Sequence, residues 1–406
     1  MNIGKNSCMQ RVNKLAKIRF KGYDISLERK TIGDITTSFS GGTPKSSNKS
    51  YYEGNIPFIR SGEVKSKQTE LFISDEALNN SSAKLVEKGD ILYALYGATS
   101  GEVAISRING AINQAILAIK PKPGYSSEFI MNYLKKEKDN ILEKYLQGGQ
   151  GNLSAAIVKS IELSLPSQEE QSAIGSLFRT LDDLLSSYKD NLANYKALKA
   201  TMLSKMFPKA GQTVPEIRLG GFEGDWEIKR ADEIFKSVSK KNRASLPVLS
   251  ASQIDGMVLR DEIGIDIKYD EATLNNYKVV KPGQFVIHLR SFQGGFALSK
   301  LEGITSPAYT IIDFIDKANS LPDFWNSILT SRDFIKRLET VTYGIRDGKS
   351  ISFKDFSSLK FVFPEFKEQQ AIGAYFSNLD NLINSHQEKI SQLETLKKKL
   401  LQDMFI

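Results

Sequence analysis

Loop residues in both halves of the chain carry side chains that suit contact with nucleic acid. Arg and Lys pair with guanine edges or phosphates, Asn and Gln pair with adenine edges, and neighbouring glycines let the backbone approach a sugar–phosphate chain closely. In the first half, the candidate DNA-binding residues are Thr43, Lys45, Arg60, Ser61, Lys65, Tyr96, Thr99, Ser100, Gln147, Gln150 and Asn152. In the second half, they are Lys240, Lys241, Arg243, Ser252, Gln253, Arg290, Ser291, Gln293, Tyr343, Arg346 and Lys349.

For any single residue of this set, an ordinary polar loop is the alternative interpretation. The collective pattern carries the weight, because loops of this composition stand at equivalent places in both halves. Four basic residues lie in Gly/Ser loops rather than on charge-paired helix faces, and we expect them on the DNA-facing surface: Arg60, Lys65, Arg290 and Arg346.

The sequence contains no set of residues typical of an enzyme active site. The segment 344–350 resembles a phosphate-binding loop, but it has one residue too few between its glycines and a strand-like sequence after it. The glycine-rich segment 148–151 does not open a βαβ unit, so dinucleotide binding is not expected. There is no Asn-Pro-Pro-aromatic tetrapeptide of amino-methyltransferases and no acidic cluster for two-metal nuclease chemistry. We therefore predict no catalytic residue, no bound cofactor, and a binding protein rather than an enzyme.

Metal coordination is not expected either. The chain has two histidines, His288 and His386, and one cysteine, Cys8. That set is too small for a multi-histidine or thiolate metal site. A single cysteine also excludes an internal disulfide framework and fits a reducing cytoplasm.

Short strand-like segments bounded by Gly, Pro, Asn and Ser must hold the candidate loops. Each half also contains a segment with a helical pattern, and the two halves correspond loosely in the order of their elements. This mixture predicts an α+β class in which two similar globular α/β domains share one fold. The clearest strands are 90–95, 115–119, 285–289 and 309–312, and the clearest helices are 128–145 and 323–340.

A helical segment occurs twice, since Pro166 to Phe207 reappears without a gap as Pro364 to Phe405. In both copies, apolar residues recur in a 3,4 alternation over about four heptads. A proline, Pro166 or Pro364, stands just before each predicted helix, where its missing N–H is not needed, and acidic residues lie in the first turn. Each copy therefore predicts a long helix with a narrow apolar seam.

Two such helices in one chain most simply pair with each other, antiparallel, as a coiled-coil spacer. Polar residues at seam positions would fix the register, with Asn191 opposite Lys389 and Tyr188 opposite His386. The alternative is that both helices pack into a single larger core. The narrow seam and the polar outward faces favour the spacer.

The repeat divides the chain into four parts. Residues 1–165 and 208–363 are predicted to be globular domains, and residues 166–207 and 364–406 are predicted to be the helical spacer regions. Such a chain has a pseudo-two-fold internal repeat and presents two similar surfaces, which suits a target with two parts.

The charge of the chain supports a polyanionic target. Its 406 residues carry a net charge of +8, and the acidic and basic residues of the helical segments nearly balance, so the excess lies in the globular halves. No apolar run reaches the roughly 18 residues of a membrane-spanning helix, and the N-terminus has no apolar signal core. We expect a cytoplasmic protein that does not engage a membrane.

The repeated motif and the openings of the two halves resemble those of specificity subunits of type I DNA restriction–modification systems. Residues Glu368–Ile372 and their copy Glu170–Ile174 are similar to the start of the two shared helical regions of that family. Ile217–Trp226 looks like the beginning of a target-recognition domain. Gly41–Lys45, followed by Gly54–Phe58, is similar to a recurrent opening of such domains. The resemblance covers nearly the whole chain.

This resemblance implies a division of labour. Each globular half would be a target-recognition domain that reads one part of a bipartite double-stranded DNA site, and the helices would hold the halves apart. Two methyltransferase subunits and two restriction subunits with motor and nuclease activity would be the partners. S-adenosylmethionine, ATP and Mg²⁺ would act in those partners, and this chain would be the non-catalytic specificity subunit.

Three other interpretations stay open at this point. The main alternative is a coiled-coil scaffold protein whose two globular domains bind other proteins. A second is an enzyme acting within one half. A third, a fused subunit with its own methyltransferase, is disfavoured because the sequence contains no methyltransferase segment.

Overall fold

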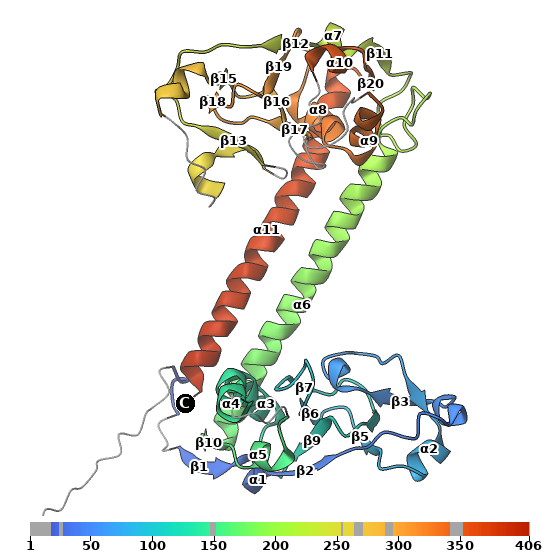
Figure 1. Ribbon diagram of the computed structural model, residues 1–406, viewed down its shortest axis with the longest axis vertical. Helices are drawn as coiled ribbons and strands as arrows, with labels where there is room; N and C mark the ends of the chain where they lie inside the picture. The colour runs from blue at the N-terminus through green and yellow to red at the C-terminus, as the bar shows by residue number, and fades with distance from the viewer. Residues whose placement is uncertain are drawn as a thin grey trace, which may run out of the picture. The chain divides into compact units, whose positions relative to one another are not determined.

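The computed structural model describes residues 18–23, 27–146, 152–252, 255–263, 271–288, 295–341 and 352–405. The chain forms two compact units (Figure 1). The first unit comprises residues 1–189 together with 388–406, and the second unit comprises residues 190–387. The division into four parts predicted from the sequence stays a prediction.

A four-stranded antiparallel sheet with the order β2-β9-β6-β7 forms the centre of the first unit. All four residues of β6 are buried, because helices and a second sheet cover its faces. The second sheet has the order β4-β3-β8-β5, and β1 pairs with β10. The strands are β1 (Glu28–Thr31), β2 (Thr36–Ser40), β3 (Ile56–Ile59), β4 (Phe72–Ile73), β5 (Lys84–Val86), β6 (Ile91–Ala94), β7 (Val103–Ile105), β8 (Gly110–Ile112), β9 (Ile116–Pro121) and β10 (Glu162–Leu165).

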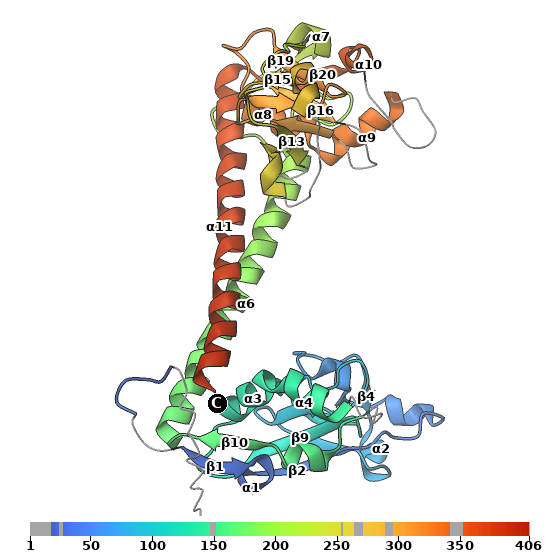
Figure 2. The same ribbon diagram turned by 60° about the vertical axis from the view of Figure 1, so that its left-hand side comes forward.

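Short helices pack against these strands, with α3 and α4 above the central sheet in Figure 2. Helix α3 begins after Ser126 because the Ser126 hydroxyl accepts a hydrogen bond from the backbone N–H of Phe129, at 3.3 Å. Its apolar face, with Phe129, Ile130 and Leu134, is buried in the core. The helices are α1 (Ile32–Ile35), η1 (Lys49–Tyr52), η2 (Ser61–Glu63), α2 (Asp75–Asn79), α3 (Ser127–Lys136), α4 (Lys138–Leu146) and α5 (Ala155–Lys159).

The second unit repeats the central sheet in the same order, β12-β19-β16-β17. It also repeats the outer pair, because β11 pairs with β20 as β1 pairs with β10. Its strands are β11 (Glu227–Arg230), β12 (Phe235–Val238), β13 (Leu249–Ser252), β14 (Gly256–Leu259), β15 (Lys278–Val280), β16 (Phe285–His288), β17 (Gly295–Leu298), β18 (Gly303–Thr305), β19 (Thr310–Phe314) and β20 (Lys360–Phe363). Its helices are α7 (Ala231–Ile234), η3 (Arg260–Ile263), η4 (Glu271–Asn276), α8 (Pro322–Leu329), α9 (Arg332–Val341) and α10 (Phe353–Ser357). The predicted α+β class with one fold used twice is confirmed.

Two long helices, α6 (Gln168–Lys205) and α11 (Phe366–Met404), contribute to both units. In the first unit, Lys397 pairs with Asp182, and Lys189 pairs with Glu394 at 2.6 Å. In the second unit, Lys199 pairs with Asp380 at 2.5 Å. Lys397 and Asp182 stand at the repeat positions of Lys199 and Asp380. The same ion pair therefore occurs twice: once the lysine comes from α6 and the aspartate from α11, and once the reverse. This reciprocity confirms the antiparallel pairing and the pseudo-two-fold repeat.

A ring contact also joins the two helices within the second unit. The ring of His386 packs edge-on against Tyr195, with 5.2 Å between the ring centroids. Tyr188 packs against the core cluster of the first unit, which includes Leu393. The predicted pairings of Asn191 with Lys389 and of Tyr188 with His386 stay predictions.

Candidate nucleic-acid interface

Gln114 joins two of the predicted DNA-binding loops of the first unit. The Thr43 hydroxyl donates a hydrogen bond to Gln114 Oε1 at 2.6 Å, and the Tyr96 hydroxyl donates one to the Gln114 carbonyl oxygen at 2.5 Å. Burial raises the pKa of Tyr96 above its ordinary value, so the phenol stays protonated and keeps donating. The Gln114 side chain itself is exposed, at the turn between β8 and β9. It is therefore a candidate DNA contact that the sequence analysis missed.

The other two loops of the first unit are tied to the same end of β6. The backbone N–H of Leu153, next to Asn152, donates to the Leu95 carbonyl oxygen at 2.9 Å, and the Ser100 hydroxyl donates to that oxygen at 3.2 Å. The Glu102 carboxylate binds Lys65 and Lys138, which fixes the loop after β3 to the β6–β7 hairpin. All four loops therefore meet beside one hairpin, and the side chains that the structure describes there are the exposed Thr43, Lys45 and Asn152 and the half-buried Ser61, Thr99 and Ser100. Gln147 and Gln150 lie outside the described residues.

Arg60 and Lys65 are both paired with carboxylates of the fold, and their place on the DNA-facing surface stays a prediction. The Arg60 guanidinium donates to Glu63 at 2.8 Å and to Glu70 at 2.9 Å, and these carboxylates raise the pKa of Arg60 above its ordinary value. Burial alone would raise the pKa of Glu63, but hydrogen bonds led by those from Arg60 lower it to about 2. Lys65 pairs with Glu102. Glu63, Glu70 and Glu102 lie between 3 and 37 positions after the basic residue that each of them binds. The composition of the loops did not indicate that these carboxylates would pair with Arg60 and Lys65.

In the second unit, the segment after β12 presents three exposed cations, Lys240, Lys241 and Arg243. Its backbone is anchored, because the Val279 N–H donates to the Lys240 carbonyl oxygen at 2.7 Å and the Asn242 N–H donates to the Asn275 carbonyl oxygen at 3.1 Å. Asn242 has a φ of 64°, a left-handed conformation that Asn adopts more readily than most residues. Within the described part of the chain, none of the three cations forms an ion pair. They make a fixed basic edge that fits phosphates.

Lys278 adds a cation to this edge that the sequence analysis missed. Its ammonium group donates to the Tyr309 carbonyl oxygen at 2.6 Å. Burial, and then the nearby charge of Lys241, lower the pKa of Lys278 below its ordinary value. The Tyr309 ring lies edge-on to His288, with 6.2 Å between the ring centroids, and burial lowers the pKa of His288. Lys278 is the first residue of β15 and does not belong to a Gly/Ser-rich loop, so the loop composition could not identify it. The folded chain places it beside the basic segment that follows β12.

For the other candidate DNA-binding residues of the second half, contact with DNA stays a prediction. Ser252 ends β13, and its hydroxyl accepts a hydrogen bond from the Asp255 N–H at 3.2 Å. The segment 344–350 also lies outside the described residues, as do Gln253, Arg290, Ser291, Gln293, Tyr343, Arg346 and Lys349.

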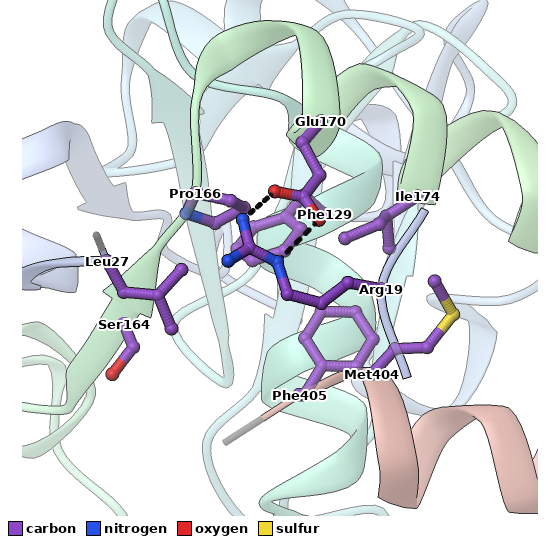
Figure 3. A pocket seen from close by; sticks show the side chains of 9 residues that line it. All are labelled: Arg19, Leu27, Phe129, Ser164, Pro166, Glu170, Ile174, Met404 and Phe405. Atoms are coloured by element: carbon purple, nitrogen blue, oxygen red, sulfur yellow. Dashed lines mark hydrogen bonds and ion pairs between the residues drawn. The ribbon is translucent and has the colours of Figure 1, made fainter. Parts of the chain in front are cut away.

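A matched polar junction joins each globular part to the start of its long helix. In the first unit, Arg19 donates two hydrogen bonds to Glu170, one of them from Nε at 3.0 Å (Figure 3). In the second unit, Arg218 binds Glu368 in the same way, at 2.8 and 2.7 Å. Both carboxylates are about 1% exposed. Each therefore needs its arginine to compensate the negative charge that is buried away from water.

The glutamine after each of these glutamates makes a second matched contact. Gln171 accepts from the Ser126 N–H at 3.2 Å and donates to the Pro166 carbonyl oxygen at 3.0 Å. Gln369 accepts from the Leu321 N–H at 3.1 Å and donates to the Pro364 carbonyl oxygen at 3.0 Å. Since Ser126 and Leu321 precede α3 and α8, the repeated Glu-Gln pair orients each globular part on its helix.

The cavity beside Arg19 and Glu170 is too small for a ligand. Its volume is about 10 Å³, the lower limit for one water molecule, and apolar side chains such as Phe129 and Phe405 form much of its wall (Figure 3). Among the described residues, no three His, Cys, Asp or Glu side chains come together to hold a metal ion. No helix that the structure describes is long and apolar enough to cross a membrane.

Comparisons of the sequence and of the structure with known proteins point to the same family. The family model for the type I restriction modification DNA specificity domain matches residues 25–194 and 223–395. The chain is 24% identical over 387 residues to the type I restriction enzyme MjaVIII specificity subunit of Methanocaldococcus jannaschii, covering 91% of this chain and 90% of that protein. It is 25% identical to the EcoR124I/EcoR124II specificity subunit of Escherichia coli over 41% of this chain and 43% of that one. The solved S subunit of the type I restriction–modification system of M. genitalium has the same fold, with a TM-score of 0.64, 16% identity, and coverage of 97% and 99% of the two chains.

Proposed function

Because the chain belongs to the family of type I restriction–modification DNA specificity subunits, which recognise DNA and do no chemistry themselves, we propose that each of its two units reads one part of a bipartite double-stranded DNA site. The observation that carries this proposal is the repeated sheet order, β2-β9-β6-β7 and β12-β19-β16-β17. One scaffold used twice, with different loops at the same end of its sheet, suits two readers of different sequences.

The loop residues of each unit have separate tasks in this proposal. Exposed cations that pair with no carboxylate among the described residues, such as Lys45, Lys240 and Lys241, contact phosphates and position the duplex. Amide and hydroxyl groups held by the fold, above all Gln114 with Thr43, contact base edges. A preorganised set of this kind loses little side-chain entropy when DNA binds. The predicted residues outside the described segments keep their place in the proposal.

The long helices α6 and α11 serve as the spacer that determines how many base pairs stay unread. Helix α6 has 38 residues, which corresponds to about 57 Å at 1.5 Å per residue. The two reciprocal Lys–Asp pairs fix one register between the helices. A fixed register with a fixed helix length gives a fixed separation of the two half-sites.

Members of this family assemble with methyltransferase and restriction subunits. In the proposed complex, two methyltransferase subunits and two restriction subunits join one copy of this chain. The pseudo-two-fold repeat supports a pair of equivalent docking surfaces. S-adenosylmethionine, ATP and Mg²⁺ act in those partner subunits, and the complex works in the cytoplasm, which the single cysteine of the chain supports.

Co-expression with the partner subunits and genome-wide mapping of methylated bases test this function. The proposal predicts one bipartite motif with a fixed gap, present only when this chain is expressed. The purified chain alone should neither methylate nor cleave DNA. Methyl transfer by the chain free of partner subunits, or a single uninterrupted motif, would contradict the proposal. A scaffold protein would leave the methylation pattern unchanged.

A further inference from the structure

A basic cleft lies in the first unit, outside the loops discussed above. It has a volume of about 1180 Å³ and runs between β7, α3 and the parts of α6 and α11 that belong to this unit. Nine Lys and Arg residues line it, against four Asp and Glu residues. This imbalance makes the cleft a site of positive potential rather than an ordinary mixed surface.

The acids of the cleft do not neutralise this excess, because three of the four are already paired with cations of the same cleft. The pairs are Arg179 with Glu128, Lys189 with Glu394 and Lys397 with Asp182.

Five further cations of the cleft form no ion pair with any residue that the structure describes. Four of them are exposed, and Lys135 is half-buried. Burial lowers the pKa of Lys135 to about 8, and the charge of the neighbouring Lys397 adds to this effect. Lys135 is therefore still protonated at pH 7 without a carboxylate of its own. The five residues are Lys67, Lys88, Arg107, Lys135 and Lys398.

The second unit does not repeat this concentration of charge. The repeat positions of four cleft cations carry neutral side chains there: Ser377 in place of Arg179, Gln387 in place of Lys189, Ala200 in place of Lys398 and Thr330 in place of Lys135. A docking surface for two identical partner proteins would be repeated in both units. The asymmetry therefore argues against an acidic surface of such a partner as the occupant.

The cleft is continuous with the predicted DNA-facing loops. Lys65, one of the candidate DNA-binding residues, also lines the cleft, and Glu102 joins it to Lys138. A DNA strand that passes the loops at the end of β6 meets the cleft next to Lys65.

We propose that this cleft binds the phosphate backbone of DNA beside the half-site read by the first unit, as a sequence-independent anchor that the second unit lacks. The inference rests on the proposed function and deepens it, because it assigns backbone affinity and base reading of the first unit to different surfaces. Phosphate contacts of this kind strengthen binding to every sequence without specifying bases.

The test compares two variants of the full chain in its assembled complex. The cleft variant carries Lys67→Gln, Lys88→Gln, Arg107→Gln and Lys398→Gln. The control variant removes the same number of exposed positive charges outside the cleft, with Lys159→Gln, Lys354→Gln, Lys367→Gln and Lys399→Gln. Affinity is measured over a range of salt concentrations for a duplex with the mapped motif and for a shuffled duplex of equal length.

The cleft variant should bind both duplexes about 10- to 100-fold more weakly at moderate salt. The slope of the logarithm of its binding constant against the logarithm of the salt concentration should be smaller in magnitude by about three to four. It should still methylate the same motif. The control variant should keep nearly the wild-type affinity and slope. Three results would overturn the inference: wild-type binding by the cleft variant, a loss confined to the motif duplex, or loss of partner subunits on co-purification, which would identify an acidic protein surface as the occupant.

Failure of the proposed function gives a different result. In that case, the wild-type complex would bind the motif and shuffled duplexes equally. Equal loss of both affinities in the cleft variant would still support the phosphate anchor. Discrimination by the wild type together with an unaffected cleft variant would remove the anchor and leave the proposed function intact.

Discussion

The Arg218 guanidinium donates two hydrogen bonds to the Glu368 carboxylate, from Nε at 2.8 Å and from a terminal nitrogen at 2.7 Å. Glu368 opens α11, and Arg218 lies in the segment that leads into the second globular part. Arg19 and Glu170 make the same contact in the first unit. Each globular part is thus held on its helix by a bidentate ion pair whose carboxylate is buried.

Removing one partner of this pair should cost far more than removing both. Arg218→Ala leaves the Glu368 carboxylate buried without a partner, and we expect the free energy of unfolding to fall by about 3–5 kcal/mol. The double variant Arg218→Met/Glu368→Met should lose much less, because no charge stays buried. Denaturant unfolding of both variants checks this. A loss below about 1 kcal/mol in Arg218→Ala would mean that the pair behaves as an exposed salt bridge.

Matched glycines in the long helices should respond differently to alanine. A Cβ on Gly175 would lie 2.8 Å from the Glu128 Cβ, which the α3 backbone fixes, whereas a Cβ on Gly373 would meet the movable end of the Leu321 side chain at 2.8 Å. Alanine improves helix propensity by about 1 kcal/mol, and overpacking costs about 1–3 kcal/mol. We expect Gly175→Ala to lower the midpoint of thermal unfolding and Gly373→Ala to leave it nearly unchanged. Equal effects would show that the two junctions pack alike.

Glu63 should contribute stability that depends on pH. Its folded-state pKa, about 2, lies below the ordinary value of 4.5, so its contribution is fully present above pH 4.5 and is lost as the pH falls toward 2. After allowance for solvent screening, Glu63→Gln should reduce the free energy of unfolding by about 1 kcal/mol at pH 7. The difference from wild type should shrink as the pH falls through about 2 and vanish below it. A difference that is independent of pH would assign the effect of Glu63 to packing.

Helix length should determine the unread gap of the DNA site. Insertion of one heptad into both α6 and α11 keeps the seam in phase and adds about 10.5 Å, close to three base pairs. Methylated motifs mapped in such a strain should show a gap longer by about three base pairs. Insertion of two residues rotates the seam by about 200° and should abolish assembly rather than tune the gap. An unchanged gap after the heptad insertion would contradict the spacer role of the helices.

The sequence predicted the features that local patterns encode. The repeat of Pro166–Phe207 and its heptad seam identified α6 and α11, and the alternation of strands and turns identified β6, β9, β16 and β19 of the two central sheets. Features that depend on distant contacts were missed. The carboxylate partners of Arg60 and Lys65, the place of Lys278 and the role of Gln114 all come from contacts that only the folded chain makes.

The register of the helices depends on contacts outside the apolar seam. The heptad pattern identified the faces that pair, and the Lys–Asp pairs and the contact between Tyr195 and His386 fix which turns of the two helices meet.

The most direct test of the account is genome-wide mapping of methylated bases after exchange of one reader. Residues 1–165 would be replaced by the corresponding region of another specificity subunit, with both long helices and the second globular part retained. The account predicts a motif in which one half-site changes while the other half-site and the gap stay as they were. A motif in which both half-sites change, or in which neither does, would contradict two independent readers on one spacer.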